Sequence, residues 1–281
     1  MYQIIFLWIL ALVFIIFAVV QDIRTKEISN WLNFSLIIFA LGFRLFYSIF
    51  EGDNFSFFYN GLIGFGIFFL IGNLFYYSRL FAGGDAKLMI ALGTILPVST
   101  SFILNLQSFL SFLVLFLISG FIYTIFVSLF LCIKNFKGFI KEFKKQIREK
   151  RKLSYLFLVA GIIFILIGFL EIYAIPVGLL IFLTFFLYIY SKSIDESSMV
   201  KIISTSKLRE GDWLYLNIKV GNKIIKTSWD GLSKKDIKEI MKYHKQIRIR
   251  EGVVFSPVFL IAFLLWVISF LTGFNLWNSL W

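Results

Sequence analysis

Two aspartates stand at the ends of apolar segments, where a carboxylate is costly unless it is paired, solvated or functional. Asp22 directly follows the first apolar run, and Asp85 opens a later one. Two carboxylates at one depth on different helices suit acid–base hydrolysis of a peptide bond. One takes a proton from water while the other, protonated, polarises the scissile carbonyl, since like charges so close cannot both ionise cheaply.

Other common hydrolytic mechanisms lack the residues that they need. A zincin needs two histidines and a glutamate on one helix, and the chain has a single histidine, His244. Cys132 lies inside an apolar run with no base nearby, which disfavours a thiol nucleophile and a thiolate metal cluster. The sequence also holds no G-x-S-x-G elbow, P-loop or dinucleotide fingerprint. We therefore expect neither a metal nor a cofactor.

The sequence around each aspartate also has a purely structural interpretation. Gly83 and Gly84 permit positive φ and a close backbone approach, but they could equally form a loop whose Asp85 caps the next helix. Asp22 precedes Arg24 in what could be an ordinary basic turn. Each string alone favours the structural interpretation, whereas their occurrence together favours a functional pair.

The composition places the chain in a membrane. Of its 281 residues 59% are hydrophobic, and the mean hydropathy is +0.88, which exceeds what a soluble domain of this size can bury. Apolar runs of about 20 residues recur, and each can cross a ~30 Å hydrocarbon core. We predict a polytopic all-α bundle of about eight spans, six to eight being plausible, at residues 2–20, 30–50, 57–77, 85–97, 104–133, 153–170, 174–191 and 253–272. The first run lacks a basic region before it and is interpreted as a retained helix.

The basic residues orient these spans. With both termini outside, residues 21–29, 78–87, 134–152 and 192–252 face the cytoplasm and hold 27 of the 28 Lys and Arg residues. Arg44 is the exception. This orientation brings Asp22 and Asp85 to the cytoplasmic membrane face.

A net charge of +12 does not indicate nucleic acid here, because the charge flanks the spans. Residues 134–152 combine nine basic residues with Phe and Ile at helical spacing. Such an amphipathic helix is expected to lie on anionic lipid of the inner leaflet.

Residues 192–252 form the one sizeable soluble segment, a cytoplasmic α+β module before the last span. Alternation over residues 214–220, a Gly221-Asn222 turn and residues 223–227 predict a hairpin. Ser233 with Asp236 predicts a capping box for a helix to about Lys245, with Ile237, Ile240 and Met241 on one face, and Ile247 and Ile249 predict a last strand. We divide the chain into a core (1–133), a basic segment (134–152), two additional spans (153–191), this ββαβ module (192–252) and a final helix with its tail (253–281).

At the two aspartates the chain resembles archaeal prepilin and pre-archaellin peptidases, relatives of the bacterial type IV prepilin peptidases. Residues 22–30 are similar to the family's D-x-R-x-x-x-I-P-N segment, with Ser29 in place of the proline. Residues 82–88 are similar to its G-x-G-D-x-K-L segment, with Ala82 in place of the first glycine. Residues 208–214, 231–233 and 251–260 resemble the soluble module and final span of archaeal members.

The resemblance implies a membrane aspartyl endopeptidase of the GxGD type that removes short basic class III leader peptides from prepilin or archaellin precursors. It implies Asp22 and Asp85 as the catalytic dyad. It implies site-shaping or substrate-binding roles for Gly83, Gly84, Arg24 and Lys87. Since the paired C-x-x-C motifs and a methyl-donor fingerprint are absent from the sequence, we expect no methyltransferase activity.

Two alternatives stay open. A presenilin-like protease would carry Tyr-Asp where Gln21 precedes Asp22, and a later Pro-Ala-Leu that this chain lacks. A non-enzymatic transporter would use the two aspartates as an ion site and would show inverted repeats, of which the sequence gives no sign.

Overall fold

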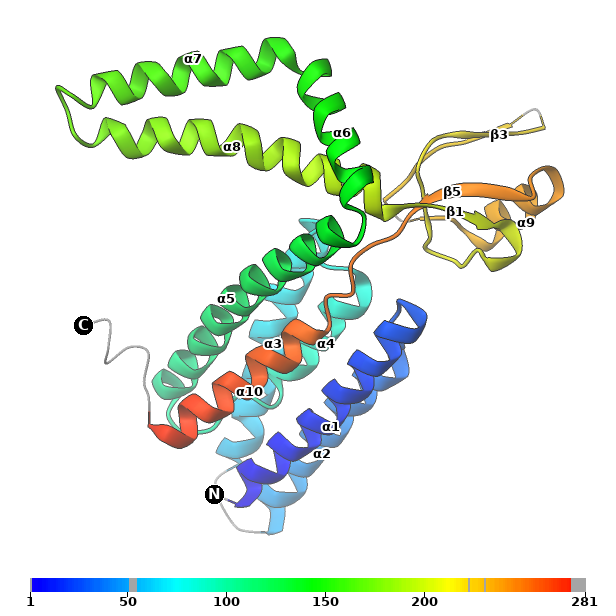
Figure 1. Cartoon of the computed structure of the whole chain (residues 1–281). Coiled ribbons are helices and arrows are strands. Elements are labelled where there is room, and N and C mark those ends of the chain that lie inside the picture. Colours follow the sequence, from blue (N-terminus) through cyan, green and yellow to red (C-terminus); the bar gives the residue numbers. More distant parts are fainter. Residues whose placement is uncertain (1, 51–54, 222, 230, 274–281) are drawn as a thin grey trace. The chain divides into compact units, whose positions relative to one another are not determined.

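The computed structural model describes residues 2–50, 55–221, 223–229 and 231–273, and it forms two compact units (Figure 1). The first unit comprises Met1–Thr124 and Val254–Trp281, and the second comprises Ile125–Val253. The last helix therefore belongs with the N-terminal helices, although the whole second unit separates them in the sequence. Asn222 of the expected turn and the tail from residue 274 lie outside the described residues.

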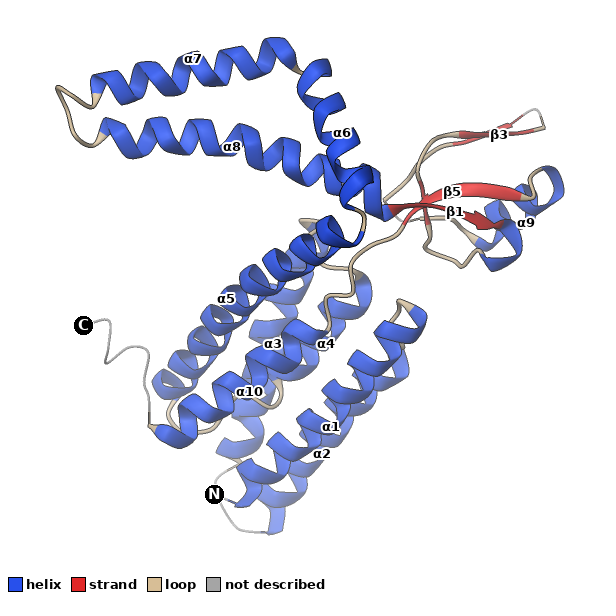
Figure 2. Cartoon of the chain, in the orientation of Figure 1, coloured by secondary structure: helices blue, strands red, loops and turns tan. Residues whose placement is uncertain are grey.

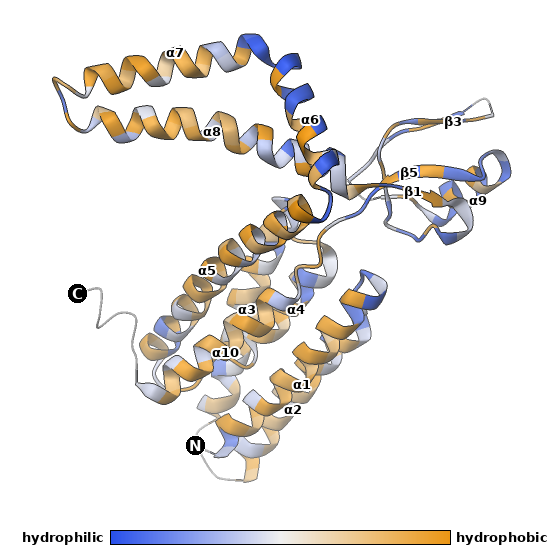
Figure 3. Cartoon of the chain, viewed as in Figure 1, coloured by the Kyte–Doolittle hydropathy of each residue, from blue (hydrophilic) through white to orange (hydrophobic). Residues whose placement is uncertain are grey.

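Apolar helices make up the first unit, as the hydropathy predicts. They are α1 (Tyr2–Thr25), α2 (Asn30–Phe50), α3 (Ser56–Tyr77), α4 (Gly83–Gly93), α5 (Phe102–Lys134, whose last turns fall in the second unit) and α10 (Pro257–Thr272). One continuous apolar core joins them, with Leu7, Ile15, Leu36, Leu92, Phe112 and Phe263 among its buried members. Figure 3 shows that hydrophobic residues predominate along these helices.

Five helical stretches in the described part of the chain are long and apolar enough to cross a bilayer. They are α1, α2, α3, α5 and Ala174–Met199. α10 is equally apolar but has only 16 residues. The membrane class that the composition predicts is thus supported, whereas the count of eight spans stays a prediction.

The expected span at residues 85–97 differs from the structure. α4 has 11 residues, or roughly 16 Å of helix at 1.5 Å per residue, about half of a ~30 Å hydrocarbon core. Seven of those residues are buried, and Ile95 and Leu96 continue the buried path without helical structure. α4 is therefore a short internal helix that the other helices surround.

Glycines let α3 and α4 approach closely. A β-carbon on Gly64 would lie 2.2 Å from the carbonyl oxygen of Gly93, and one on Gly72 would lie 2.9 Å from that of Ala86. Both distances are shorter than a real Cβ contact, so larger residues at these positions would force the helices apart.

Arg44 of α2 binds the carboxyl-terminal end of α4. Its guanidinium donates to the carbonyl oxygens of Thr94 (2.8 Å), Ile95 (3.3 Å), Pro97 (2.7 Å) and Phe57 (2.9 Å), and the side chain is fully buried. Carbonyl groups at a helix end lack intrahelical donors and carry partial negative charge. Arg44, the one basic residue outside the predicted cytoplasmic segments, therefore provides hydrogen-bond donors for the carbonyl groups at the end of α4.

The second unit begins with three helices: α6 (Phe136–Glu149), α7 (Arg151–Ile167) and α8 (Ala174–Ile194). α7 and α8 form an antiparallel pair in which a β-carbon on Gly178 would lie 2.8 Å from the carbonyl oxygen of Gly161. Figure 3 shows that both are apolar along most of their length. The apolar side of α6 is half-buried rather than free, with the Phe139 ring 5.6 Å from that of Tyr190 on α8.

The soluble module is a small α+β fold, as expected, but with a different strand pattern (Figure 2). A short π-helix (Asp195–Met199) leads into a three-stranded sheet of order β1-β5-β2. Its strands are β1 (Val200–Ser204), β5 (Gln246–Arg250) and β2 (Trp213–Leu214). A separate hairpin pairs β3 (Ile218–Val220) with β4 (Lys223–Ile225). The predicted long strand over residues 214–220 is thus two short strands in different sheets, and the alternation gave no sign of β1.

The helix of the module, α9 (Lys234–Tyr243), confirms the predicted capping box. The Ser233 hydroxyl accepts from the Asp236 backbone N–H, and the Asp236 carboxylate accepts from the Ser233 backbone. Ile240 is fully buried in the core of the module and Ile237 packs against it, whereas Met241 is half exposed.

Candidate active site

Asp22 lies on the buried side of α1. The buried positions of this helix, Ala11, Ile15, Ala18 and Val19 among them, follow helical spacing, and Asp22 continues the same stripe with 8% of its surface exposed. Its Oδ2 accepts a hydrogen bond, at 3.4 Å, from the backbone N–H of Ser256, which caps α10. The aspartate is therefore held inside the bundle rather than in a solvated turn.

Asp85 lies in the first turn of α4, with 9% of its surface exposed. Its carboxylate accepts a hydrogen bond from the backbone of Ala82, the N-cap residue. The helix begins at Gly83 with Ala82 as its N-cap residue, so the interpretation in which the glycines form a loop and Asp85 N-caps the helix is wrong. Within the described part of the chain, the buried Oδ1 of Asp85 has no hydrogen-bond partner.

The fold brings the two aspartates together. They are near enough for their charges to repel one another, although they come from helices separated by more than 60 positions in the sequence. Tyr123 of α5 also interacts electrostatically with Asp22, and its hydroxyl donates to the carbonyl of Val254 at 2.8 Å. Two buried carboxyl groups with one phenol beside them can hold and move a proton.

The two motif segments bind one another. A β-carbon on Gly84 would lie 3.0 Å from that of Ile28 and 3.3 Å from its backbone nitrogen, so glycine allows the α1–α2 connection to pack against the head of α4. Asn33 donates to the Gly84 carbonyl at 3.2 Å, and Lys87 donates to Asn30 Oδ1 at 2.6 Å. These contacts fix Asp85 relative to the end of α1.

The other expected site-shaping residues differ in their surroundings. A β-carbon on Gly83 would make only an ordinary 3.7 Å contact with Tyr76, and neither Gly83 nor Gly84 has the positive φ that the sequence suggested. Arg24 is exposed at the end of α1. Ser29, which stands in place of the usual proline, donates its backbone N–H to Gln21 at 3.0 Å and also bonds that side chain through its hydroxyl.

Sequence reasoning missed Ser256, Tyr123 and Asn33 as parts of this site. One signal was available for Ser256, because serine directly before Pro257 is typical of a helix start, where a free N–H points outward. Tyr123 and Asn33 sit within apolar runs of α5 and α2, and nothing in their spacing marks them.

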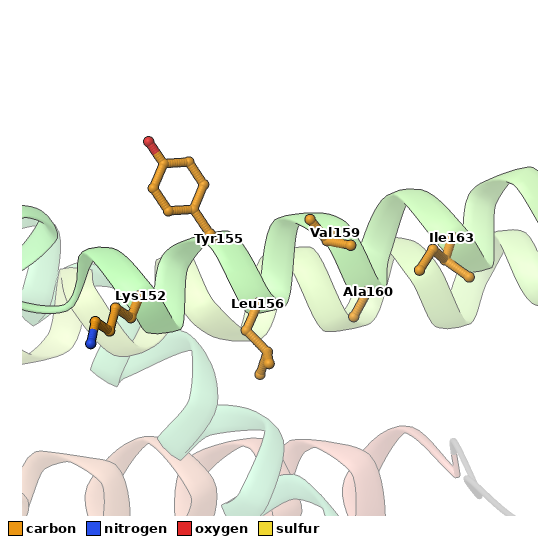
Figure 4. Close-up of a pocket in the computed structure, with 6 residues that line it drawn as sticks. All are labelled: Lys152, Tyr155, Leu156, Val159, Ala160 and Ile163. Atoms are coloured by element: carbon orange, nitrogen blue, oxygen red, sulfur yellow. The ribbon is translucent and has the colours of Figure 1, made fainter.

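A surface depression in the second unit holds no comparable chemistry. Figure 4 shows its lining residues, Lys152, Tyr155, Leu156, Val159, Ala160 and Ile163, all from α7. A groove along one helix with a single charged side chain offers no constellation for catalysis. In the described residues, no group of three or more His, Cys, Asp or Glu side chains is placed to hold a metal.

The helices that carry the two aspartates match a known family. Residues 9–133 match the type IV leader peptidase family. The chain is also 30% identical, over 128 residues, to a preflagellin peptidase of Methanococcus maripaludis. That alignment covers 43% of this chain and 55% of the relative, so the chain spans about half the length of the curated relative it matches. No solved structure matches significantly.

The family match confirms the resemblance that the two aspartate motifs predict, since residues 22–30 and 82–88 both lie inside it. It ends at residue 133, before most of the second unit and before α10. The resemblance over residues 208–260 therefore stays a prediction.

Proposed function

We propose that this chain is a membrane aspartyl endopeptidase that removes short basic leader peptides from type IV prepilin-like or archaellin precursors, with Asp22 and Asp85 as its catalytic dyad. The observation that carries the proposal is the meeting of these two buried carboxyl groups, from α1 and α4, inside the segment that matches the leader peptidase family. The match to the leader peptidase family supports hydrolysis of a leader peptide as the reaction, and the two aspartates supply the acid and the base that this hydrolysis needs.

The reaction follows from one proton shared by two carboxyl groups. The ionised aspartate accepts a proton from water as the water oxygen attacks the scissile carbonyl carbon, and the protonated aspartate donates to the carbonyl oxygen. On collapse of the diol intermediate, the first aspartate passes its proton to the leaving nitrogen and the second recovers one from the diol. The pair ends as it began and titrates as a unit.

In this proposal the dyad works at the cytoplasmic membrane face, and both termini are outside. The distribution of Lys and Arg supports it. A substrate whose basic leader is kept in the cytoplasm presents its cleavage site at the cytoplasmic end of its own apolar helix, at the depth of Asp22. The exposed lysines of α6 add contacts to anionic lipid headgroups, while its apolar side packs partly on α8. Proteolysis proceeds without cofactor, metal or nucleic acid, and without methylation of the product.

The test is cleavage of a panel of synthetic or co-expressed prepilin and archaellin precursors by membranes that contain the full chain. Asp22→Asn and Asp85→Asn should each stop cleavage while the protein stays folded. Glu27→Gln is the matched control, because it removes an exposed carboxylate from the loop directly after α1 and should leave cleavage intact. Undiminished cleavage by either aspartate variant rejects the dyad.

Orientation has its own test. Cys132 is the single cysteine of the chain, so a Cys132→Ser background allows one cysteine at a time to be placed at Lys141 or Gln3. Membrane-impermeant thiol reagent applied to right-side-out vesicles should label position 3 and leave position 141 unlabelled. The reverse pattern overturns the proposed orientation.

A further inference from the structure

We propose that Ser256, at the head of α10, assigns the roles of the two aspartates: its backbone N–H keeps the negative charge on Asp22, which is the base, and leaves the proton on Asp85, which is the acid. Ser256 is thus a positioning residue in the reaction. The inference rests on the proposed function and goes beyond it, because a dyad alone does not say which carboxyl group does what.

The head of α10 favours a charge on Asp22. Ser256 N–H donates to Asp22 Oδ2, and the 16-residue helix that starts at Pro257 directs its partial positive end toward the same carboxylate. Proline at this first position has no N–H of its own, which leaves the Ser256 donor as the one that meets the aspartate. A hydrogen bond to the charged form of a group favours that form.

The surroundings of Asp85 favour the proton. Its Oδ1 is sealed from solvent and meets no donor among the described residues. Asp85 does lie in the first turn of α4 and accepts one bond from Ala82. A helix end of this kind contributes less than an unsatisfied buried charge costs, so burial decides the balance. A protonated Oδ1 would turn the unpaired acceptor into a donor for the substrate carbonyl.

The segment that carries the donor is held firmly. The Tyr123 hydroxyl binds the Val254 carbonyl, two residues before Ser256. Phe255 packs among Phe81 and Phe116, with ring centroids 5.9 Å away in each case. The position of the Ser256 N–H is therefore set by α5 as well as by α10.

The charged groups that face Asp22 are few. Asp85 on α4 and Tyr123 on α5 interact with it electrostatically, and Arg24 and Lys26 follow it on the exposed side of its own chain segment. α10 has no charged residue between Pro257 and Thr272, and the one charged residue of α2, Arg44, binds the opposite end of α4. On α4, Lys87 donates to Asn30 Oδ1. Arg44 and Lys87 thus bind other groups, and the Ser256 N–H is the donor that the Asp22 carboxylate meets.

The experiment measures the pH profile of kcat/KM for leader cleavage. Ser256→Pro removes the backbone N–H while the local φ of −54° suits proline. Without the donor, the charge on Asp22 is less favoured in every ionised form of the dyad. The acidic limb should therefore move up by about half to one pH unit, less than for a short charge-assisted bond because the donor–acceptor distance is 3.4 Å, while the basic limb stays in place.

Three further variants complete the design. Ser256→Ala keeps the N–H, so its acidic limb should coincide with that of the wild type whatever its rate. Tyr123→Phe releases Val254 without altering a helix, and should give a smaller shift of the acidic limb in the same direction. Tyr190→Phe is its control, because that hydroxyl contacts Ser128 in the second unit and its loss should move neither limb.

The outcomes separate cleanly. A basic limb that moves while the acidic limb stays fixed would mean that Asp85 carries the charge, and overturns the assignment. So would two unmoved limbs in Tyr123→Phe, which decides the matter if Ser256→Pro does not fold. Absence of cleavage by the wild type would instead reject the proposed function, and a wild type that cleaves with unshifted variants rejects only the role of Ser256.

Discussion

Replacing Arg44 with methionine tests whether the short internal helix depends on a buried cation. The change keeps much of the side-chain volume but removes all four hydrogen bonds to the carbonyls of Thr94, Ile95, Pro97 and Phe57. Bonds from a charged donor contribute about 1.5–3 kcal/mol each, so the gross loss is roughly 6–12 kcal/mol. The variant regains the several kcal/mol that burying a guanidinium costs. We expect a net loss of about 3–5 kcal/mol in the free energy of unfolding.

The assay is unfolding of the full chain in detergent, followed by near-ultraviolet circular dichroism. Trp8 and Trp266 report on the first unit, because their rings lie 5.7 Å apart in its core. Arg148→Met, on the exposed side of α6, is the control and should change stability by less than about 0.5 kcal/mol. An Arg44→Met protein within about 1 kcal/mol of the wild type would refute the reasoning, since the carbonyls would then be satisfied without the arginine.

Three smaller perturbations test other parts of the fold. Lys87→Met removes the bond to Asn30 between the two motif segments, and because that bond is exposed, thermal unfolding should show a loss under about 1 kcal/mol. Ser233→Ala removes the cap of α9 and should cost about 1 kcal/mol, seen as faster amide hydrogen exchange confined to that helix. Gly178→Leu places a side chain against the Gly161 carbonyl and should expose the α7–α8 pair to proteolysis. A loss well above about 1 kcal/mol for Lys87→Met, unchanged exchange in α9 for Ser233→Ala, or unchanged proteolysis for Gly178→Leu would contradict the contact concerned.

Hydropathy located the helices of the first unit well, because a run such as Tyr2–Thr25 has few alternatives in a bilayer. Hydropathy overestimated the length of α4, because the residues after the helix ends are apolar too and hydropathy does not mark the end. Gly93 and the Arg44 donors end this helix, and the partnership of Arg44 with residues 50 positions away cannot be read from local sequence.

Strands were harder to predict. Val200–Ser204 is separated from the long apolar α8 only by Asp195–Met199, and five residues are too few to give a separate strand signal. The alternation from Leu214 to Val220 predicted one strand, but Asn217 interrupts it by accepting a hydrogen bond from the Thr227 backbone. Tertiary contacts therefore decided where each strand began and ended.

In the candidate site too, the sequence predicted local features but not the contacts between distant residues. Asp22 and Asp85 could be found from the sequence because a carboxylate at the end of an apolar run is conspicuous. Ser256 could not be connected with Asp22, since 234 positions separate them and only the packing of α10 beside α1 brings them together. Type and position of a charge are local properties, whereas the donor that a charge meets is a property of the fold.

The bond between Tyr123 and Val254 marks where the polypeptide leaves the helical bundle and where it returns. Because Tyr123 and Val254 are in contact, the segment between them is an insertion whose two ends lie side by side in the bundle. The length and sequence of this inserted segment can change at a small cost in loop-closure entropy, because that cost rises only slowly with length. Replacing the segment after Tyr123 with a short linker is thus a practical route to an isolated six-helix core. A different inserted segment could also be accommodated at this place in the sequence without changes to the helices of the first unit.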